Sequence, residues 1–175
     1  MHAPPGAMPP LQLYTARLGA YRAADGLDIT RMNKDPIGVA FAPSWDILQP
    51  ALHARQRARD TREAGELAAR EQPAAAAYLR ARAAQEAEEI EAAAWKVYEP
   101  AYVEEMRASW REHQSVWLEV ARRAEVTLLC ACTDTARCHR TVAARLLVKA
   151  ATSRGIVVEL RGEREPPAPA QQRLF

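Results

Sequence analysis

The chain has 175 residues, of which 49% are hydrophobic, and its formal net charge at pH 7 is +2. This length suits one domain with a sizeable core, and the apolar fraction excludes a disordered chain. The small net charge does not by itself indicate nucleic-acid binding, and the odd number of cysteines argues against a disulfide framework and favours reduced thiols in the cytoplasm.

Residues 1–10 are rich in proline and contain no apolar core, so we expect a flexible arm here and neither a signal peptide nor a membrane anchor. No apolar run approaches the length that crosses a bilayer, and we expect no contact with membranes. The predicted single domain spans residues 11–164, and a Pro- and Ala-rich linker with a C-terminal peptide follows over residues 165–175.

Short strands are predicted near the N-terminus. Residues 11–14 alternate apolar and polar side chains, residues 27–30 follow a turn pair, and residues 39–41 are a third candidate. Ser44 then predicts an N-cap, with a helix that begins at Trp45.

A long helical region follows, and Pro73 divides it by opening a second helix. Residues 51–94 are rich in Ala, Arg and Glu, which predicts a helical hairpin or lid inserted into the domain. Aromatic residues then recur at helical spacing. This pattern is typical of core packing; alternatively, Tyr98 and Tyr102 line a ligand pocket.

The last third predicts a strand, a helix and another strand. Residues 126–131 form an apolar run typical of a strand buried on both faces, and residues 141–153 have helical periodicity. Gly155 predicts a left-handed cap before a strand over residues 156–160. This unit is a right-handed βαβ crossover, so the sequence predicts a three-layer α/β fold with a mostly parallel sheet and a helical insertion.

The loop between Cys130 and Thr141 is the predicted functional site. Ligands bind beyond the carboxyl ends of parallel strands, and the helix that follows directs backbone N–H groups and a partial positive charge toward that place. Basic side chains outnumber acidic ones around this loop, so we expect an anionic ligand that carries phosphate. The predicted anion ligands are Arg17, Arg137, Arg140 and Thr141, and Tyr14 and Cys130 are predicted to line the pocket.

Cys138 stands between Arg137 and His139 at the predicted start of the helix. A helix N-terminus and neighbouring cations lower the pKa of a thiol, so Cys138 is a candidate nucleophile and His139 a candidate general acid or base. The alternative is a small buried cysteine that packs the turn. Cys132 and Arg137 also have the spacing of a short anion loop, although the glycines typical of sulfurtransferases and thiol phosphatases are missing.

A zinc site is a further alternative, because Cys130, Cys132, Cys138 and His139 are soft ligands within ten residues. Cys138 and His139 are adjacent, which makes chelation of one ion awkward, and Cys130 on a buried strand would point into the core. We therefore predict neither a metal nor another cofactor from the sequence.

Two parts of the sequence resemble the family known as domain of unknown function 488. Leu128-Leu129-Cys130 followed by Cys138-His139-Arg140 resembles the family signature, and residues 14–17, 21, 27–30, 42–44 and 98–102 resemble one of its branches. The resemblance covers most of the chain except the insert. It implies an α/β fold and a site at Cys130, Cys138, His139 and Arg140, but no reaction. Cys132 departs from the family pattern, which puts a catalytic role for this residue in doubt.

The last five residues resemble the peptide that binds the bacterial sliding clamp. Leu174 and Phe175 would enter an apolar pocket of the clamp, and Gln171 would form a hydrogen bond at its rim. The sequence therefore predicts a protein that binds a nucleotide or nucleic acid, either as an enzyme of DNA metabolism or as a non-catalytic adaptor, with a thiol or zinc site as the remaining alternative. It does not decide the substrate or the oligomeric state.

Overall fold

The computed structural model describes residues 9–164, so the predicted arm up to residue 8 and the linker and peptide over residues 165–175 lie outside the described residues. The chain divides into two compact units. The first contains the described residues up to Ala42 and those from Val103 onward, and the second is Pro43–Tyr102. The predicted helical insert, 51–94, lies within the second unit.

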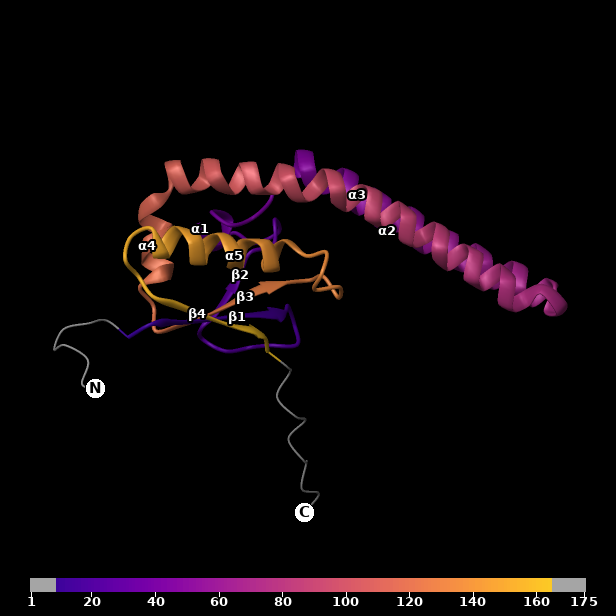
Figure 1. Cartoon of the computed structure of the whole chain (residues 1–175), viewed down its shortest axis with the longest axis horizontal. Helices are drawn as coiled ribbons and strands as arrows, with labels where there is room; N and C mark the ends of the chain where they lie inside the picture. Colours follow the sequence, from indigo (N-terminus) through magenta and orange to yellow (C-terminus); the bar gives the residue numbers. More distant parts are fainter. Residues whose placement is uncertain (1–8, 165–175) are drawn as a thin grey trace, which may run out of the picture. The chain divides into compact units, whose positions relative to one another are not determined.

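A four-stranded sheet forms the centre of the first unit (Figure 1). Its strands are β1 (Leu11–Arg17), β2 (Gly26–Asp28), β3 (Glu125–Cys130) and β4 (Val158–Glu163), in the spatial order β2-β3-β1-β4. Every strand pairing among the described residues is parallel. The carboxyl ends of β1 and β3 therefore lie side by side, with Arg17 paired to Cys130.

The two central strands, β1 and β3, are buried for different reasons. The sequence of β3 places apolar side chains on both faces, and that of β1 places them at alternate positions. Leu11 and Leu13 of β1 are fully buried, and every residue of β3 after Glu125 is buried. This matches the continuous apolar run from which the sequence predicts a strand, since a strand covered on both faces needs no polar alternation.

The predicted βαβ unit is confirmed as β3, α5 (His139–Thr152) and β4. Helix α5 lies on one face of the sheet (Figure 1), and its inward stripe buries Val142 and Leu147. Gly155 has a φ of +73°, the left-handed conformation expected after the helix. The helix begins two residues earlier than predicted and the last strand begins two residues later, because the periodicity does not mark the ends of an element.

The strand predicted over residues 39–41 is wrong, since this segment belongs to the short helix α1 (Pro36–Val39) and the turn after it. The Asp35 carboxylate accepts a hydrogen bond from the Ile37 N–H at 3.0 Å, and Pro36 suits the first turn of a helix. A Cβ on Gly38 would lie 2.1 Å from the Asp28 carbonyl oxygen, so this close approach requires glycine.

Two members of the aromatic pattern, Trp110 and Trp117, belong to the first unit, and Trp117 packs into its core, as the periodicity predicts. Trp117, on α4 (Gln114–Ala121), is 1% exposed and lies with its ring centroid 4.4 Å from that of Phe41. Its indole N–H donates to Ser109 Oγ at 3.1 Å, which satisfies the polar atom of a buried ring.

The second unit is a helical hairpin. It contains α2 (Trp45–Glu71), a 3₁₀ turn η1 (Pro73–Ala75) and the larger part of α3 (Ala76–Glu112). Ser44 occupies the N-cap of α2 and Pro73 opens the second arm, as predicted. The two helices lie close together where Gly65 faces Ala83, because a Cβ on Gly65 would lie 2.3 Å from the Ala83 methyl carbon.

The predicted α/β class with a parallel sheet and a helical insertion is therefore confirmed, and the sheet is parallel throughout instead of mostly so. None of the helices within residues 9–164 has both the length and the apolar character needed to cross a membrane.

Candidate functional site

The candidate site lies in the first unit, where β1 and β3 end and the loop 131–138 leads into α5. Two backbone contacts fix this edge of the sheet. The Leu18 N–H donates to the Cys130 carbonyl at 2.9 Å, and the Ile29 N–H donates to the Leu129 carbonyl at 3.1 Å. Segments far apart in the sequence therefore meet around Cys130.

Four side chains converge at this edge. The Sγ atoms of Cys130, Cys132 and Cys138 and a ring nitrogen of His139 all lie within 4.8 Å of one another. The Cys130 Sγ lies 3.4 Å from the Cys132 Sγ and 3.7 Å from the His139 Nδ1. Cys130 and Cys138 are 2% and 1% exposed and His139 is 6% exposed, whereas Cys132 is partly exposed.

The orientation of the His139 ring is fixed by a contact of its Nε2 atom. Its Nε2 lies 3.2 Å from the Ile29 carbonyl oxygen, which can only accept a hydrogen bond. In the neutral imidazole the proton is therefore on Nε2, and the lone pair of Nδ1 faces the thiols. A backbone carbonyl that fixes the ring in this way is the usual second contact of a metal-binding histidine.

Arg140 joins the site to the last strand. Its guanidinium is 1% exposed and donates to both carboxylate oxygens of Glu163, at 2.8 and 3.2 Å. The Nη1 atom also donates to the Cys132 carbonyl at 2.8 Å and lies 3.4 Å from the Cys138 Sγ. Thr15 completes this network, because its hydroxyl donates to Glu163 at 2.6 Å. A direct contact between Arg140 and a ligand anion stays a prediction.

The packing of the three thiols decides the direction of the pKa shifts of Cys130 and Cys138. The hydrogen bond with Cys132, together with burial, raises the pKa of Cys130 to about 11. Cys130, Cys132 and burial also raise the pKa of Cys138. The helix N-terminus predicts a lowered pKa for Cys138, so the direction of the shift is opposite to the predicted one. The reason is that several thiolates cannot share so small a volume without a cation.

The arrangement suits a thiophilic divalent ion. Zinc binds thiolates at about 2.3 Å and imidazole at about 2.0–2.1 Å, so tetrahedral ligand atoms lie roughly 3.5–3.8 Å apart. The distance from Cys130 Sγ to His139 Nδ1, 3.7 Å, falls in this range, and the distance to Cys132 Sγ, 3.4 Å, lies just below it. Cys138 and His139 converge although they are adjacent, because Cys138 is extended (φ −133°, ψ 135°) and His139 begins the helix.

The predicted anion ligands are distributed around the same edge. Arg17 is exposed at the end of β1, and Arg137 is partly exposed in the loop. The Thr141 hydroxyl donates to the Thr135 carbonyl at 2.8 Å and closes the loop on itself. The first turn of α5 has no side-chain cap, since Cys138 makes no hydrogen bond of that kind.

Tyr14 is not brought to the cysteine cluster. Side chains alternate between the two faces of β1, so Tyr14 lies on the face opposite to Thr15. There the Arg164 guanidinium lies 3.7 Å from the centroid of the Tyr14 ring.

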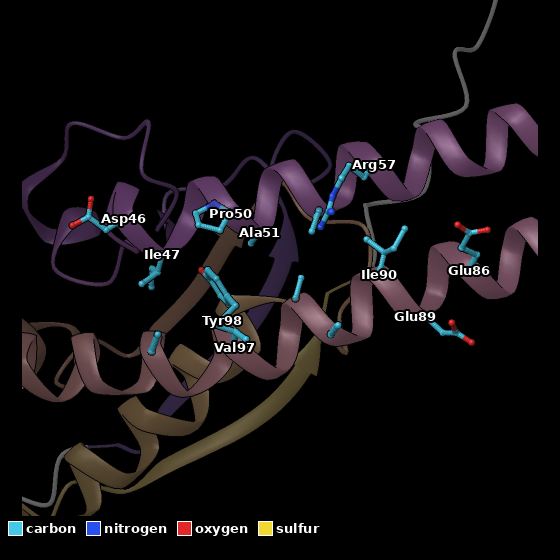
Figure 2. A pocket seen from close by; sticks show the side chains of 14 residues that line it. Asp46, Ile47, Pro50, Ala51, Arg57, Glu86, Glu89, Ile90, Val97 and Tyr98 are labelled. Atoms are coloured by element: carbon cyan, nitrogen blue, oxygen red, sulfur yellow. The ribbon is translucent and has the colours of Figure 1, made fainter.

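Tyr98 and Tyr102 belong to the second unit and are 5% and 0% exposed. Tyr98 lines an apolar cavity of about 600 Å³ between α2 and α3 (Figure 2). In the figure its ring lies beside Pro50 and Ala51, with Arg57 further along α2. The predicted pocket at Tyr98 is therefore one in the hairpin, formed without the residues of the cysteine cluster.

Sequence reasoning missed Glu163, Thr15 and the Ile29 carbonyl. Glu163 lies in a polar strand end with no motif around it, and a backbone carbonyl leaves no signal in a sequence. These groups are found only once the parallel sheet has placed β1 and β2 beside β3, and β4 beside β1.

The chain was compared with protein families, curated proteins and solved structures. A family model, DUF488-N3a, described as the active DUF488-N3 subclade, matches residues 13–151. No curated protein and no solved structure matches the chain. The matched range includes all four residues of the cysteine cluster, the whole second unit and most of the described first unit, but it ends before β4.

Proposed function

The chain belongs to the DUF488 family, in the active DUF488-N3 subclade, and from that premise we propose that it functions through a zinc centre held by Cys130, Cys132, Cys138 and His139. The observation that carries the proposal is the convergence of four soft donor atoms within 4.8 Å. Reduced thiols are required, which fits a cytoplasmic location.

Two surrounding contacts support the proposal. The Ile29 carbonyl holds the His139 ring so that Nδ1 is the donor atom. Three thiolates exceed the charge of a divalent ion, and the Arg140 guanidinium beside Cys138 offsets part of the excess. With the fourth position occupied by His139, the centre is closed, as in zinc sites that stabilise a loop.

Elemental analysis of the full chain, purified under reducing conditions without chelator, tests this proposal. We expect about one zinc per chain. His139→Asn should lower zinc affinity by about tenfold or more. His53→Asn, an exposed histidine on α2, is the matched control and should leave zinc affinity unchanged. Protein that carries no zinc and takes up none from a zinc solution would show that the proposal is wrong.

A phosphate-bearing ligand, a nucleotide or nucleic acid, is a second candidate for the same edge of the sheet. The exposed Arg17 and the uncapped first turn of α5 support it. In this proposal Cys138 and His139 supply any chemistry, with Arg137, Arg140 and Thr141 around the anion, and the chain acts in DNA metabolism. Calorimetric titration with nucleotides tests it: Arg17→Ala should weaken binding at least about tenfold, while Arg22→Ala should not.

Recruitment to the sliding clamp stays a proposal that rests on Gln171, Leu174 and Phe175, which lie outside the described residues. Replacing both Leu174 and Phe175 with Ala should abolish binding of the full chain to purified clamp, since apolar side chains dominate such peptide contacts. Gln172→Ala, within the same peptide, should have little effect.

A further inference from the structure

The apolar cavity between α2 and α3 lies wholly within the second unit, and its lining includes no residue of the cysteine cluster. Its volume, about 600 Å³, is within the range of about 300–1,000 Å³ for sites that bind small molecules. Alanine side chains leave this space open, because they are too small to fill the gap beside the buried Tyr98 ring (Figure 2). The alanines that line it are Ala51, Ala54, Ala93, Ala94 and Ala101.

The dimensions of the cavity favour a slender molecule. Along α2 the lining extends from Asp46 to Arg57, which corresponds to about 16 Å of helix. A volume of about 600 Å³ over this length gives a cross-section of about 40 Å². An α-helix with its side chains is about 10–12 Å across and has a cross-section of roughly 80–110 Å². The cavity is therefore too narrow for a partner helix and fits a flat ring system or an alkyl chain.

The charged side chains that line the cavity give it a net negative charge. Asp46, Glu86 and Glu89 are acidic, and Arg57 is the only basic residue in the lining. Figure 2 shows Arg57 toward the same end as the two glutamates, whereas Asp46 lies at the other end. Arg57 therefore offsets part of the charge of the glutamates. The whole unit Pro43–Tyr102 has the same sign, since it contains ten acidic and eight basic residues.

The Asp46 end has further features that attract a cation. Pro50 has no N–H, so the Asp46 carbonyl, four residues earlier, lacks the hydrogen bond that a helix normally supplies. The Tyr98 ring lies beside Pro50 (Figure 2), and the face of an aromatic ring attracts cations. The start of α2 contributes an opposing charge of about +0.5, which the full charge of the Asp46 carboxylate exceeds.

We propose that this cavity binds a small apolar molecule that carries one positive charge. Burial of the apolar body between the two helices provides the affinity, and the Asp46 end selects a cation over an anion. The site shares no residue with the zinc centre proposed above, so either proposal can fail without the other.

Two flat fluorescent dyes with similar ring systems and opposite charge test this proposal. Pyronin Y is a cation, and resorufin is an anion at neutral to slightly alkaline pH. Fluorescence anisotropy measures the binding of each dye to the full-length protein, purified free of nucleic acid. We expect pyronin Y to saturate one site per chain and to bind at least about tenfold more tightly than resorufin.

Variants of the lining locate the site. Asp46→Asn should weaken pyronin Y binding by about fivefold, while Asp60→Asn, an exposed acid of α2 outside the cavity, should not change it. Ala94→Phe should abolish binding because the ring fills the cavity, and Ala81→Phe, at an exposed position of α3, is its matched control. Thermal unfolding shows whether these variants are folded.

Equal affinity for the two dyes, no saturable binding of pyronin Y, or binding that survives in a folded Ala94→Phe variant would overturn the inference. If Ala94→Phe does not fold, an unchanged affinity in Asp46→Asn would overturn it. Analytical ultracentrifugation tests a different occupant. A dimer that Ala94→Phe converts to a monomer would show that a second copy of the chain fills the cavity, and the inference would be wrong.

Discussion

At the scale of single residues, Arg140 combines a structural and an electrostatic role. A guanidinium that is 1% exposed is stable only if its charge and its N–H groups are satisfied, and here Glu163 and the Cys132 carbonyl provide both. This links the end of β4 to the loop 131–138. Arg140 therefore positions the cysteines. This role is separate from the predicted contact between Arg140 and an anion.

Glu163→Gln should destabilise the protein by about 1–2 kcal/mol, because it leaves the buried guanidinium with a neutral partner that is itself 35% exposed. Urea unfolding at neutral pH measures this change. Glu159→Gln is the matched control, since Glu159 pairs with Arg161 on the surface, and it should change stability by less than about 0.5 kcal/mol. Equal effects in the two variants would contradict the role given to the Arg140 contact.

The acidic residue Asp25 has a pH-dependent role on the other face of the sheet. Partial burial raises its pKa, but hydrogen bonds from the Thr127 and Tyr21 hydroxyls, at 2.6 and 2.7 Å, outweigh burial and hold the pKa below its ordinary value. A carboxylate with a lowered folded-state pKa contributes stability at neutral pH. This contribution is lost as the pH falls from about 4 through the folded-state pKa.

Asp25→Asn should therefore reduce the loss of stability on acidification. We expect urea midpoints of the wild type to fall more steeply between pH 6 and pH 3 than those of the variant. The control Asp46→Asn, on α2, should follow the wild type. A variant that lost stability as steeply as the wild type would contradict the assignment.

At the scale of elements, the helical hairpin depends on small residues where α2 and α3 meet. Ala58, Gly65 and Ala69 on α2 and Ala83 and Ala87 on α3 bring the helices close together, and the alanines among them are at most 8% exposed. Surface pairs such as Arg62–Glu91 add little to stability, because the charges remain hydrated. The packing of these small residues therefore contributes more to the stability of the hairpin than the many charged residues do.

Gly65→Ala should destabilise the protein although alanine favours helices by about 1 kcal/mol. The added methyl group would lie 2.3 Å from the Ala83 Cβ, and such overpacking costs about 1–3 kcal/mol. Combining it with Ala83→Gly should recover part of the loss, with a coupling of at least about 0.5 kcal/mol in thermal unfolding. A stabilised Gly65→Ala variant would mean that the helices are further apart.

At the scale of the whole molecule, the site is assembled from separate parts of the first unit. Ile29 follows β2, Cys130 ends β3 with the other two cysteines after it, and Glu163 ends β4. None of the four proposed zinc ligands lies in the hairpin unit, Pro43–Tyr102. Zinc should therefore stabilise the first unit by joining the end of β3 to the start of α5.

Zinc at about 100 times its dissociation constant should raise the Tm by about 5 °C or more, since binding to the folded state alone contributes about 2.7 kcal/mol. Cys138→Ser should abolish the shift, and magnesium should produce none in the wild type. Differential scanning calorimetry under reducing conditions measures both. An equal shift in Cys138→Ser would place the zinc elsewhere in the chain.

The sequence by itself determined the α/β class, the buried strand of β3, the βαβ unit, the helical hairpin and the family. These features depend on local signals, namely periodicity, caps and a short motif, that are carried by neighbouring residues. Residues 39–41 show the limit of such signals, because a capped turn of α1 replaced the predicted strand.

Only the tertiary structure decided what the motif residues contact. Parallel pairing placed Ile29 and Glu163 beside the loop after Cys130, and the change from extended to helical backbone at Cys138 turned two adjacent side chains toward one point. Alternation along β1 placed Tyr14 on the other face. The physical reason is that a site is a set of distances between separate segments, and the packing of the sheet sets those distances.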